Sequence, residues 1–266
     1  NNGGNNGGNN GGNNGGGDCP ENLSYVGQIF TADEPDPLSP NGGMPTTDAF
    51  AADYDCGIEA ALAMVPTSTE EEMNTADVEL ALTGCTVTAT YFNTANQPVP
   101  RANREFWLQD GKGAIKVFFF AGEDENDPVR ANHPDFSIKV GQKLSLSVSQ
   151  LTNFNGLAEI TGASGWSLDS ENNPVSIWDA TGSDLTTDDV AKLVRITGTL
   201  SADSTDCGAT AKCYEFDHGA ANLIILRTSS QFVEGGQCVT FVGPVGTFAG
   251  DLQLDAANFD WLWTNN

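Results

Sequence analysis

The chain has 266 residues, of which 39% are hydrophobic, and its 36 acidic and 11 basic residues give a formal net charge of −25. This length is enough for two small hydrophobic cores. Phosphate backbones bind through lysine and arginine, so the charge leads us to expect no nucleic-acid partner. No apolar run is long enough for a membrane span, and no signal peptide is visible, so the sequence reads as a mature secreted form.

The chain begins with NNGGNNGGNNGGNNGGG, a repeat that predicts a flexible arm over residues 1–17. Glycine and asparagine tolerate many backbone conformations and bury no apolar surface. The arm therefore supplies reach and forms no core of its own.

Residues 18–45 hold one isolated strand, ENLSYVGQIF, followed by a proline-rich linker. A strand without a neighbour in sequence pairs either far away in its own chain or with another chain. We expect insertion into a neighbouring subunit, where it fills an open sheet edge. The alternative is that the strand folds onto its own barrel and the repeat is only a spacer. The predicted inserted residues are Leu23, Tyr25, Val26, Ile29 and Phe30.

Residues 46–75 are predicted to form a helical segment and an acidic connector. Thr47 or Asp48 caps the start of the expected helix and Pro66 ends it. Apolar residues recur at three- and four-residue spacing, at Phe50, Tyr54, Ile58, Ala61, Leu62 and Val65.

From residue 76 onward the sequence alternates as β-strands do, and the pattern restarts in the second half. Residues 140–168 and 234–261 share the order glycine, strand, Phe-x-Gly turn, strand and tryptophan, with a period of about 95 residues. We therefore predict two β-domains, over residues 76–180 and 181–266.

Six cysteines are widely spaced and form no CxxC pair, which favours disulfides over zinc. Disulfides indicate an oxidising compartment, so we expect an extracellular or cell-surface protein. Cys207 and Cys213 flank a short loop suited to a hairpin bridge. The remaining four can pair in three ways, which the sequence leaves open: Cys19, Cys56, Cys85 and Cys238.

Three motifs follow one another in the first β-domain: F-x-L-Q-D at 106–110, G-x-x-L-x-L at 141–146 and F-x-G-L-x-E-I at 154–160. On these motifs residues 76–264 resemble the tandem OB-fold domains of secreted bacterial proteins, often found beside extracellular nucleases. The resemblance implies two OB-like β-barrels, and says little about function because such barrels serve many tasks. In the motif that begins at Gly141, Ser147 or Val148 stands at the position where these domains usually have glycine. The first copy carries the motif residues Phe106, Leu108, Gln109, Asp110, Gly141, Leu144, Leu146, Phe154, Gly156, Leu157, Glu159 and Ile160. The second, looser copy carries Gly236, Val239, Phe241, Gly243, Phe248, Gly250 and Leu252.

One stretch has the composition of a nucleic-acid site, because Lys112 and Lys116 lie near Trp107 and the run Phe118–Phe120. The alternative, which the net charge favours, is that these aromatic residues fill the barrel. The two histidines, His133 and His218, belong to no metal-binding or nucleophile motif. We therefore expect no enzymatic activity and name no catalytic residue.

Acidic loops offer oxygen ligands, and a structural calcium ion is the only cofactor they indicate. None has EF-hand spacing, so solvated loops are the alternative. The calcium candidates are Asp33, Asp36, Asp124 and Asp127. The sequon Asn22-Leu23-Ser24 marks Asn22 as a glycosylation candidate.

The sequence thus predicts a mainly all-β protein with two tandem OB-like β-barrels, a short N-terminal helical segment and a low-complexity arm. The functional hypothesis is a structural subunit of an extracellular fibre, a homopolymer similar to donor-strand fibres. The alternative is a cell-surface OB-fold binding module for a polysaccharide or nucleic acid, tethered by the repeat.

Overall fold

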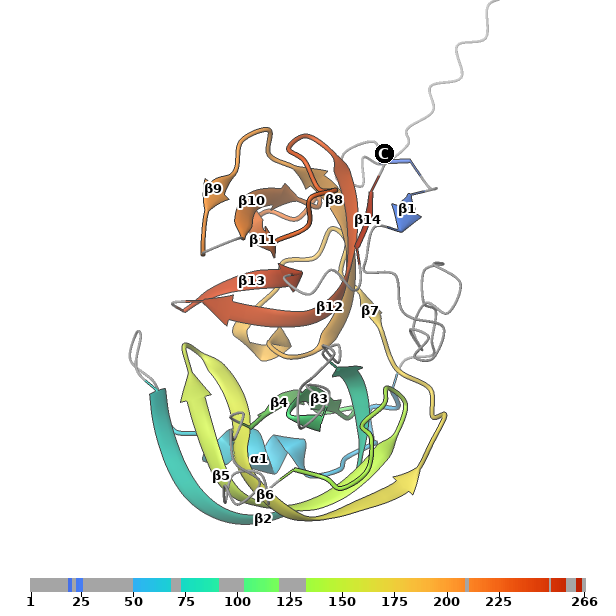
Figure 1. Cartoon of the computed structure of the whole chain (residues 1–266), viewed down its shortest axis with the longest axis vertical. Helices are drawn as coiled ribbons and strands as arrows, with labels where there is room; N and C mark the ends of the chain where they lie inside the picture. The colour runs from blue at the N-terminus through green and yellow to red at the C-terminus, as the bar shows by residue number, and fades with distance from the viewer. Residues whose placement is uncertain are drawn as a thin grey trace, which may run out of the picture.

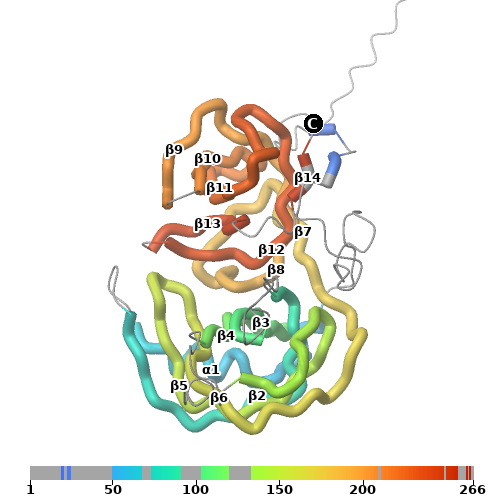
Figure 2. Tube along the Cα trace, in the orientation of Figure 1, coloured from blue at the N-terminus to red at the C-terminus, as the bar shows by residue number. Residues whose placement is uncertain are grey.

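The computed structural model stacks two β-barrels along the long axis of the molecule (Figure 1 and Figure 2). The first barrel is built from strands between residues 73 and 170, and the second from strands between residues 193 and 256. The structure describes residues 19–20, 23–25, 50–67, 73–90, 103–119, 133–208, 211–248, 250–256 and 262–264.

The first barrel closes in the order β2-β3-β4-β6-β5, in which only β4 and β6 run parallel. β2 pairs with β3 on one side and with β5 on the other, and bulges in its pairing let this long strand bend around the barrel. The strands are β2 (Met73–Thr90), β3 (Glu105–Gln109), β4 (Ala114–Phe118), β5 (Lys143–Phe154) and β6 (Leu157–Ser170).

The F-x-L-Q-D motif lies on β3 and in the turn after it. Phe106 and Leu108 are fully buried in the core of the first barrel. Asp110 orders the turn, because its carboxylate accepts hydrogen bonds from the backbone N–H groups of Lys112, Gly113 and Cys56 at 2.7–2.9 Å. The motif therefore fills the barrel and fixes the β3–β4 connection.

The helix α1 (Ile58–Met64) is shorter than predicted. It begins only after Gly57, whose φ of 105° is left-handed, and Cys56 before it is held to Cys85 by a disulfide. Val65 is already extended, as expected for the residue before a proline. Thr47 and Asp48 lie outside the described residues. The helix lies beside the strands of the first barrel (Figure 1) and packs Ile58 and Ala61 into the barrel core.

The second barrel repeats the first with the same strand order and again one parallel pair, β11 with β13. β12 pairs with β8 and closes the barrel. The predicted class, two tandem OB-like barrels with one short helix, is therefore confirmed. Its strands are β8 (Leu193–Leu200), β10 (Lys212–Asp217), β11 (Ile224–Thr228), β12 (Cys238–Phe248) and β13 (Asp251–Ala256).

The short elements outside the two barrels lie at sheet edges or in connections. They are β1 (Ser24–Tyr25), β7 (Trp178–Asp179), the 3-10 turn η3 (Thr187–Asp189), β9 (Thr205–Asp206) and β14 (Leu262–Thr264).

The segment predicted to enter a neighbouring subunit pairs within its own chain. β1 lies antiparallel to β14, Cys19 is disulfide-bonded to Cys238, and Leu23 packs against buried Leu193 and Val242. These contacts give the fibre hypothesis no support, because the strand already has a partner. The other predicted inserted residues, Val26, Ile29 and Phe30, lie outside the described residues, as do Asn22 and the side chain of Tyr25.

All six cysteines form disulfides, which fits an oxidising environment. The bridge predicted between Cys207 and Cys213 is present. None of the helices in the described part of the chain has the length and hydrophobicity needed to cross a membrane.

Candidate functional site

A hollow of about 90 Å³ lies where the outer face of the first barrel meets the β12–β13 hairpin of the second. Both barrels supply its walls, so the site exists only because the two are docked. The first barrel contributes Thr90, Trp107, Lys116 and Leu157. The second contributes Phe241, Val242, Gly243, Pro244, Val245, Gly246, Thr247, Gln253, Asp255 and Ala256.

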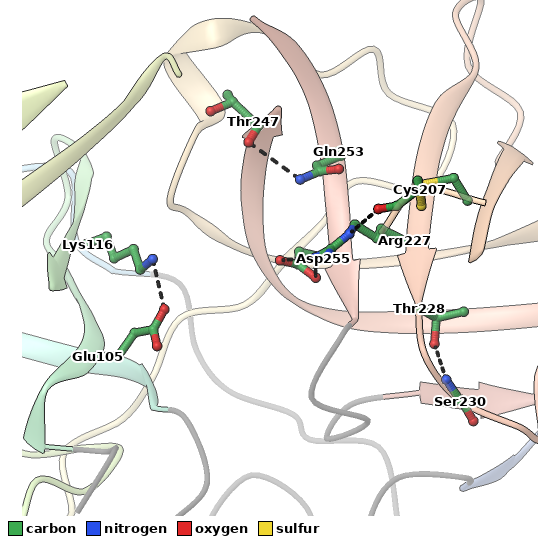
Figure 3. A network of polar contacts seen from close by, with 10 residues as sticks. Glu105, Lys116, Cys207, Arg227, Thr228, Ser230, Thr247, Gln253 and Asp255 are labelled. Carbon is green, nitrogen blue, oxygen red and sulfur yellow. Dashed lines mark hydrogen bonds and ion pairs between the residues drawn. A yellow bond between two sulfur atoms is a disulfide. The ribbon is translucent and has the colours of Figure 1, made fainter. Parts of the chain in front are cut away.

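Trp107 and Lys116 lie opposite each other on β3 and β4 and form the wall of the first barrel. The Lys116 ammonium lies 5.6 Å from the centre of the Trp107 ring and 4.8 Å from that of Phe118. It also lies 2.9 Å from a carboxylate oxygen of Glu105 and 3.2 Å from one of Glu159. This wall therefore presents an aromatic ring beside a cation that is paired with carboxylates, and Figure 3 shows the pair of Lys116 and Glu105.

The two carboxylates keep the buried Lys116 charged. Burial acts to lower the pKa of the ammonium, but Glu105 and Glu159 outweigh it and raise the pKa above its usual value. Burial raises the pKa of Glu159. The ammonium of Lys116 lowers that pKa but offsets the effect of burial only in part, because Glu159 shares this ammonium with Glu105. The triad therefore carries one more carboxyl group than ammonium groups.

Polar side chains on β13 form the facing wall. Gln253 donates from Nε2 to the backbone oxygen of Thr247 at 3.5 Å, and Asp255 accepts from Nη1 of Arg227 at 3.3 Å. Arg227 also donates from Nε to the backbone oxygen of Cys207, so the disulfide-closed loop supports this wall (Figure 3).

The docked arrangement rests on an apolar seam and one buried hydrogen bond. Ala89, Trp107 and Ala114 of the first barrel cluster with Ala191, just before β8. Nearby, the side-chain oxygen of Gln109 accepts a hydrogen bond from the backbone N–H of Leu193 at 3.1 Å. These contacts set the spacing between the two walls.

The predicted nucleic-acid face is divided by the fold. Trp107 and Lys116 reach the hollow, whereas Phe119 is buried in the core beside Trp166, at 6.1 Å between ring centres. Lys112 is exposed in the β3–β4 turn, and Phe120 lies outside the described residues. The barrel-filling interpretation thus holds for Phe119 and is wrong for Trp107.

The other candidate residues do not reach the hollow. His218 is buried against Phe216, and His133 contacts the backbone oxygen of Pro134. Within the described ranges no cluster of histidine, cysteine, aspartate and glutamate is suited to a metal ion. The calcium candidates Asp33, Asp36, Asp124 and Asp127 lie outside those ranges.

Sequence reasoning missed the polar wall on β13. Gln253 and Asp255 are two residues apart on one strand and so share a face, but the sequence does not reveal that this face meets the first barrel. The only usable signal was the internal repeat, because it placed this hairpin at the position of β5 and β6 in the first copy.

Comparison with known proteins gives no match in sequence and low TM-scores for the solved structures described below. No protein-family model and no curated protein matches the chain. Among solved structures, the tetrameric p202 HIN2 has 12% identity and a TM-score of 0.32, over 75% of this chain and 98% of that one. The p204 HINb domain has 12% identity and a TM-score of 0.30, over 72% and 98%.

One expectation from the sequence is corrected here. The net charge led us to expect no nucleic-acid partner. The OB-like architecture of the two barrels accommodates oligonucleotides as well as oligosaccharides. The exclusion of nucleic acid is therefore wrong, and nucleic acid belongs among the ligand classes to be tested.

Proposed function

We propose that the chain is an extracellular binding module that holds one ring of a polysaccharide, or of a nucleic acid, in the hollow between its barrels. The proposal rests on one observation: Trp107 lines one wall of the hollow, and Gln253 and Asp255 line the other wall. Binding pockets combine apolar and aromatic surface with a few polar groups that fix orientation. The proposed role is binding without turnover.

The size of the hollow supports a long ligand held one ring at a time. Pockets that enclose a whole drug-sized ligand have volumes of roughly 300–1,000 Å³. The hollow here has about 90 Å³. It therefore suits a single ring of a polymer whose remaining units lie on the surrounding surface.

The chemistry of the walls favours the polysaccharide. Lys116, which lines the hollow, and Arg227, which supports the wall residue Asp255, are both engaged by carboxylates. The lining otherwise presents the aromatic ring of Trp107, the amide of Gln253, the Arg227-paired carboxylate of Asp255 and backbone atoms. Sugar hydroxyls hydrogen-bond well to amides and carboxylates, and the C–H face of a sugar ring packs on an aromatic face. Nucleic acid is the second candidate because the OB architecture accommodates it.

The location is part of the proposal. Three disulfides support an oxidising compartment, as is usual for secreted proteins. β1 and β14 lie on the opposite side of the second barrel from the tip of the β12–β13 hairpin (Figure 1). A segment that leaves the barrel near Cys19 would therefore tether the module with its hollow facing outward.

The test is a binding screen of the full chain against neutral oligosaccharides and, in parallel, single- and double-stranded DNA and single-stranded RNA. Gln253→Ala removes a wall residue and should weaken binding about five- to tenfold, the effect of one lost hydrogen bond. Gln150→Ala is the matched control, because Gln150 bonds Asp77 and Thr161 away from the hollow. Equal affinities of the two variants, or no binding of any probe, would overturn the proposal.

A further inference from the structure

Two phenylalanines stand at the tips of equivalent hairpins and are largely exposed. Phe154 ends β5 and is 47% exposed, and Phe248 ends β12 and is 64% exposed. Each is the last strand residue before a two-residue turn, since Phe154 pairs with Leu157 and Phe248 pairs with Asp251. The internal repeat thus places an exposed ring at the same position in both barrels.

Both rings lie on the sheet face that lines the hollow. Residues directly opposite each other in an antiparallel pair project to the same face, so Phe154 shares a face with Leu157, which lines the hollow. Gly246 is opposite Gln253, and both line the hollow. Phe248 is two residues from Gly246 and therefore projects to the same face.

The two tips also lie side by side. A Cβ atom placed on Gly156, in the first turn, would lie 3.6 Å from the hydroxyl oxygen of Thr247. Thr247 directly precedes Phe248, and both tips are on the same side of the molecule (Figure 1 and Figure 2). The rings therefore lie beside Leu157 and Thr247, which line the hollow.

The surroundings of the rings extend an apolar surface that carries no positive charge. Met73 is opposite Phe154 on β2 and is 56% exposed. Asn153 and Asn155 flank Phe154, Thr247 precedes Phe248, and the exposed carboxylate opposite Phe248 belongs to Asp251, so the polar side chains beside the rings are neutral or acidic. Clustered exposed apolar groups beside a cavity indicate a binding surface rather than packing.

We propose that Phe154 and Phe248 form a second subsite, which takes the sugar rings on either side of the ring held in the hollow. The ligand is then a neutral oligosaccharide of several units, whose ring faces pack on the phenylalanines while its hydroxyls meet the amides beside them. This inference rests on the proposed function, because the hollow must bind a sugar for the tips to extend the site.

The experiment compares short and long ligands. The probes are a disaccharide and a hexasaccharide from each of the cello-, malto-, manno- and N-acetylchito- series, and single-stranded dT12, titrated calorimetrically into the full chain. Phe154→Ala and Phe248→Ala should each weaken hexasaccharide binding roughly tenfold and leave disaccharide binding unchanged. Phe154→Trp and Phe248→Trp should keep the affinity, because they keep an aromatic face.

Phe232→Ala is the matched control, since Phe232 is 50% exposed in the connection after β11 and does not line the hollow. If Gln253→Ala weakens hexasaccharide binding but Phe154→Ala and Phe248→Ala do not, the subsite is overturned and the proposed function stays intact. Binding of dT12 alone would overturn the assignment to sugar. Binding of no probe by the native chain would overturn the proposed function and the subsite together.

Discussion

At the scale of single residues, the ammonium of Lys116 is the charge with the largest expected effect on the stability of the first barrel. It is 9% exposed and lies between Glu105 and Glu159, which are 6% and 4% exposed. A buried charge is costly unless it is paired, and removing one partner leaves the others uncompensated. The same residue forms part of the ligand site, so the wall of the hollow is also a stability element of the first barrel.

We predict that Lys116→Met lowers the free energy of unfolding by about 3–5 kcal/mol at pH 8, because two buried carboxylates lose their cation. The loss should be smaller at pH 5. Without the ammonium the folded-state pKa of Glu159 rises further, and the stability contributed by a group with a raised folded-state pKa is lost as pH rises. Urea unfolding at both pH values measures this. Lys112→Met, at an exposed position, should change stability by less than about 0.5 kcal/mol.

A second residue-scale prediction concerns His218, which is 2% exposed and whose Nδ1 has no hydrogen-bond partner among the described residues. Burial lowers the pKa of its imidazole, with Asp217 and Asp184 opposing. In the unfolded chain the imidazole of His218 takes up a proton near pH 6.5, whereas in the folded chain it does so only at lower pH. The free energy of unfolding should therefore fall as pH drops below about 6.5.

Chemical unfolding from pH 7.5 to pH 5 tests this, and the contribution of one proton is at most about 1.4 kcal/mol for each pH unit. His218→Gln should flatten the slope, whereas His133→Gln should keep it because His218 is still present. A slope that is unchanged in His218→Gln would show that another group controls the acid response.

At the scale of elements, the hairpin turns show what the sequence can specify. Asn155 and Gly156 have φ values of 53° and 89°, which a two-residue type I′ turn requires and which Asn-Gly favours. The motif F-x-G-L-x-E-I therefore predicts a turn for a physical reason. Its glutamate, Glu159, has a role that the motif does not reveal, because its partner Lys116 comes from a different hairpin.

We predict that Gly156→Ala lowers stability by about 1–2 kcal/mol, because a Cβ atom is disfavoured in the left-handed region. Steric contact adds little, since the nearest atom to that Cβ is 3.6 Å away. Gly246→Ala is the control, because its nearest atom is also 3.6 Å away and its φ is not positive. Equal losses of stability in the two variants would contradict the turn argument.

The helix shows where the sequence was insufficient. Three- and four-residue spacing predicts a helix over residues 46–66, yet Phe50 and Tyr54 precede α1 in non-helical backbone. The Tyr54 hydroxyl instead donates a hydrogen bond to the backbone oxygen of Gly84, and the centre of its ring lies 4.4 Å from the Lys143 ammonium. Disulfide bonding of Cys56 and contact with the barrel override the local pattern, and neither is visible in sequence spacing.

At the scale of the whole molecule, the fold followed from the sequence and the site did not. Alternating apolar residues and the internal repeat predicted the two barrels. The hollow depends on how the barrels dock, which is decided by contacts between distant residues such as Gln109 and Leu193. The same holds for the N-terminal strand, whose pairing is set by the bond between Cys19 and Cys238.

We predict that Gln109→Ala weakens the docking of the two barrels. The buried N–H of Leu193 then loses its acceptor, at a cost of about 1–3 kcal/mol. In scanning calorimetry the native chain should unfold in one main transition, and Gln109→Ala should broaden or split it. Gln150→Ala serves as the control, and the same broadening in both variants would contradict a specific docking role.

Ligand binding at the junction of the two barrels can be tested by hydrogen–deuterium exchange with and without the tightest-binding oligosaccharide. We expect new protection on both walls at once, in β3 and β4 of the first barrel and in β12 and β13 of the second. Protection confined to one barrel, or located around β9 and β10 away from the hollow, would contradict it.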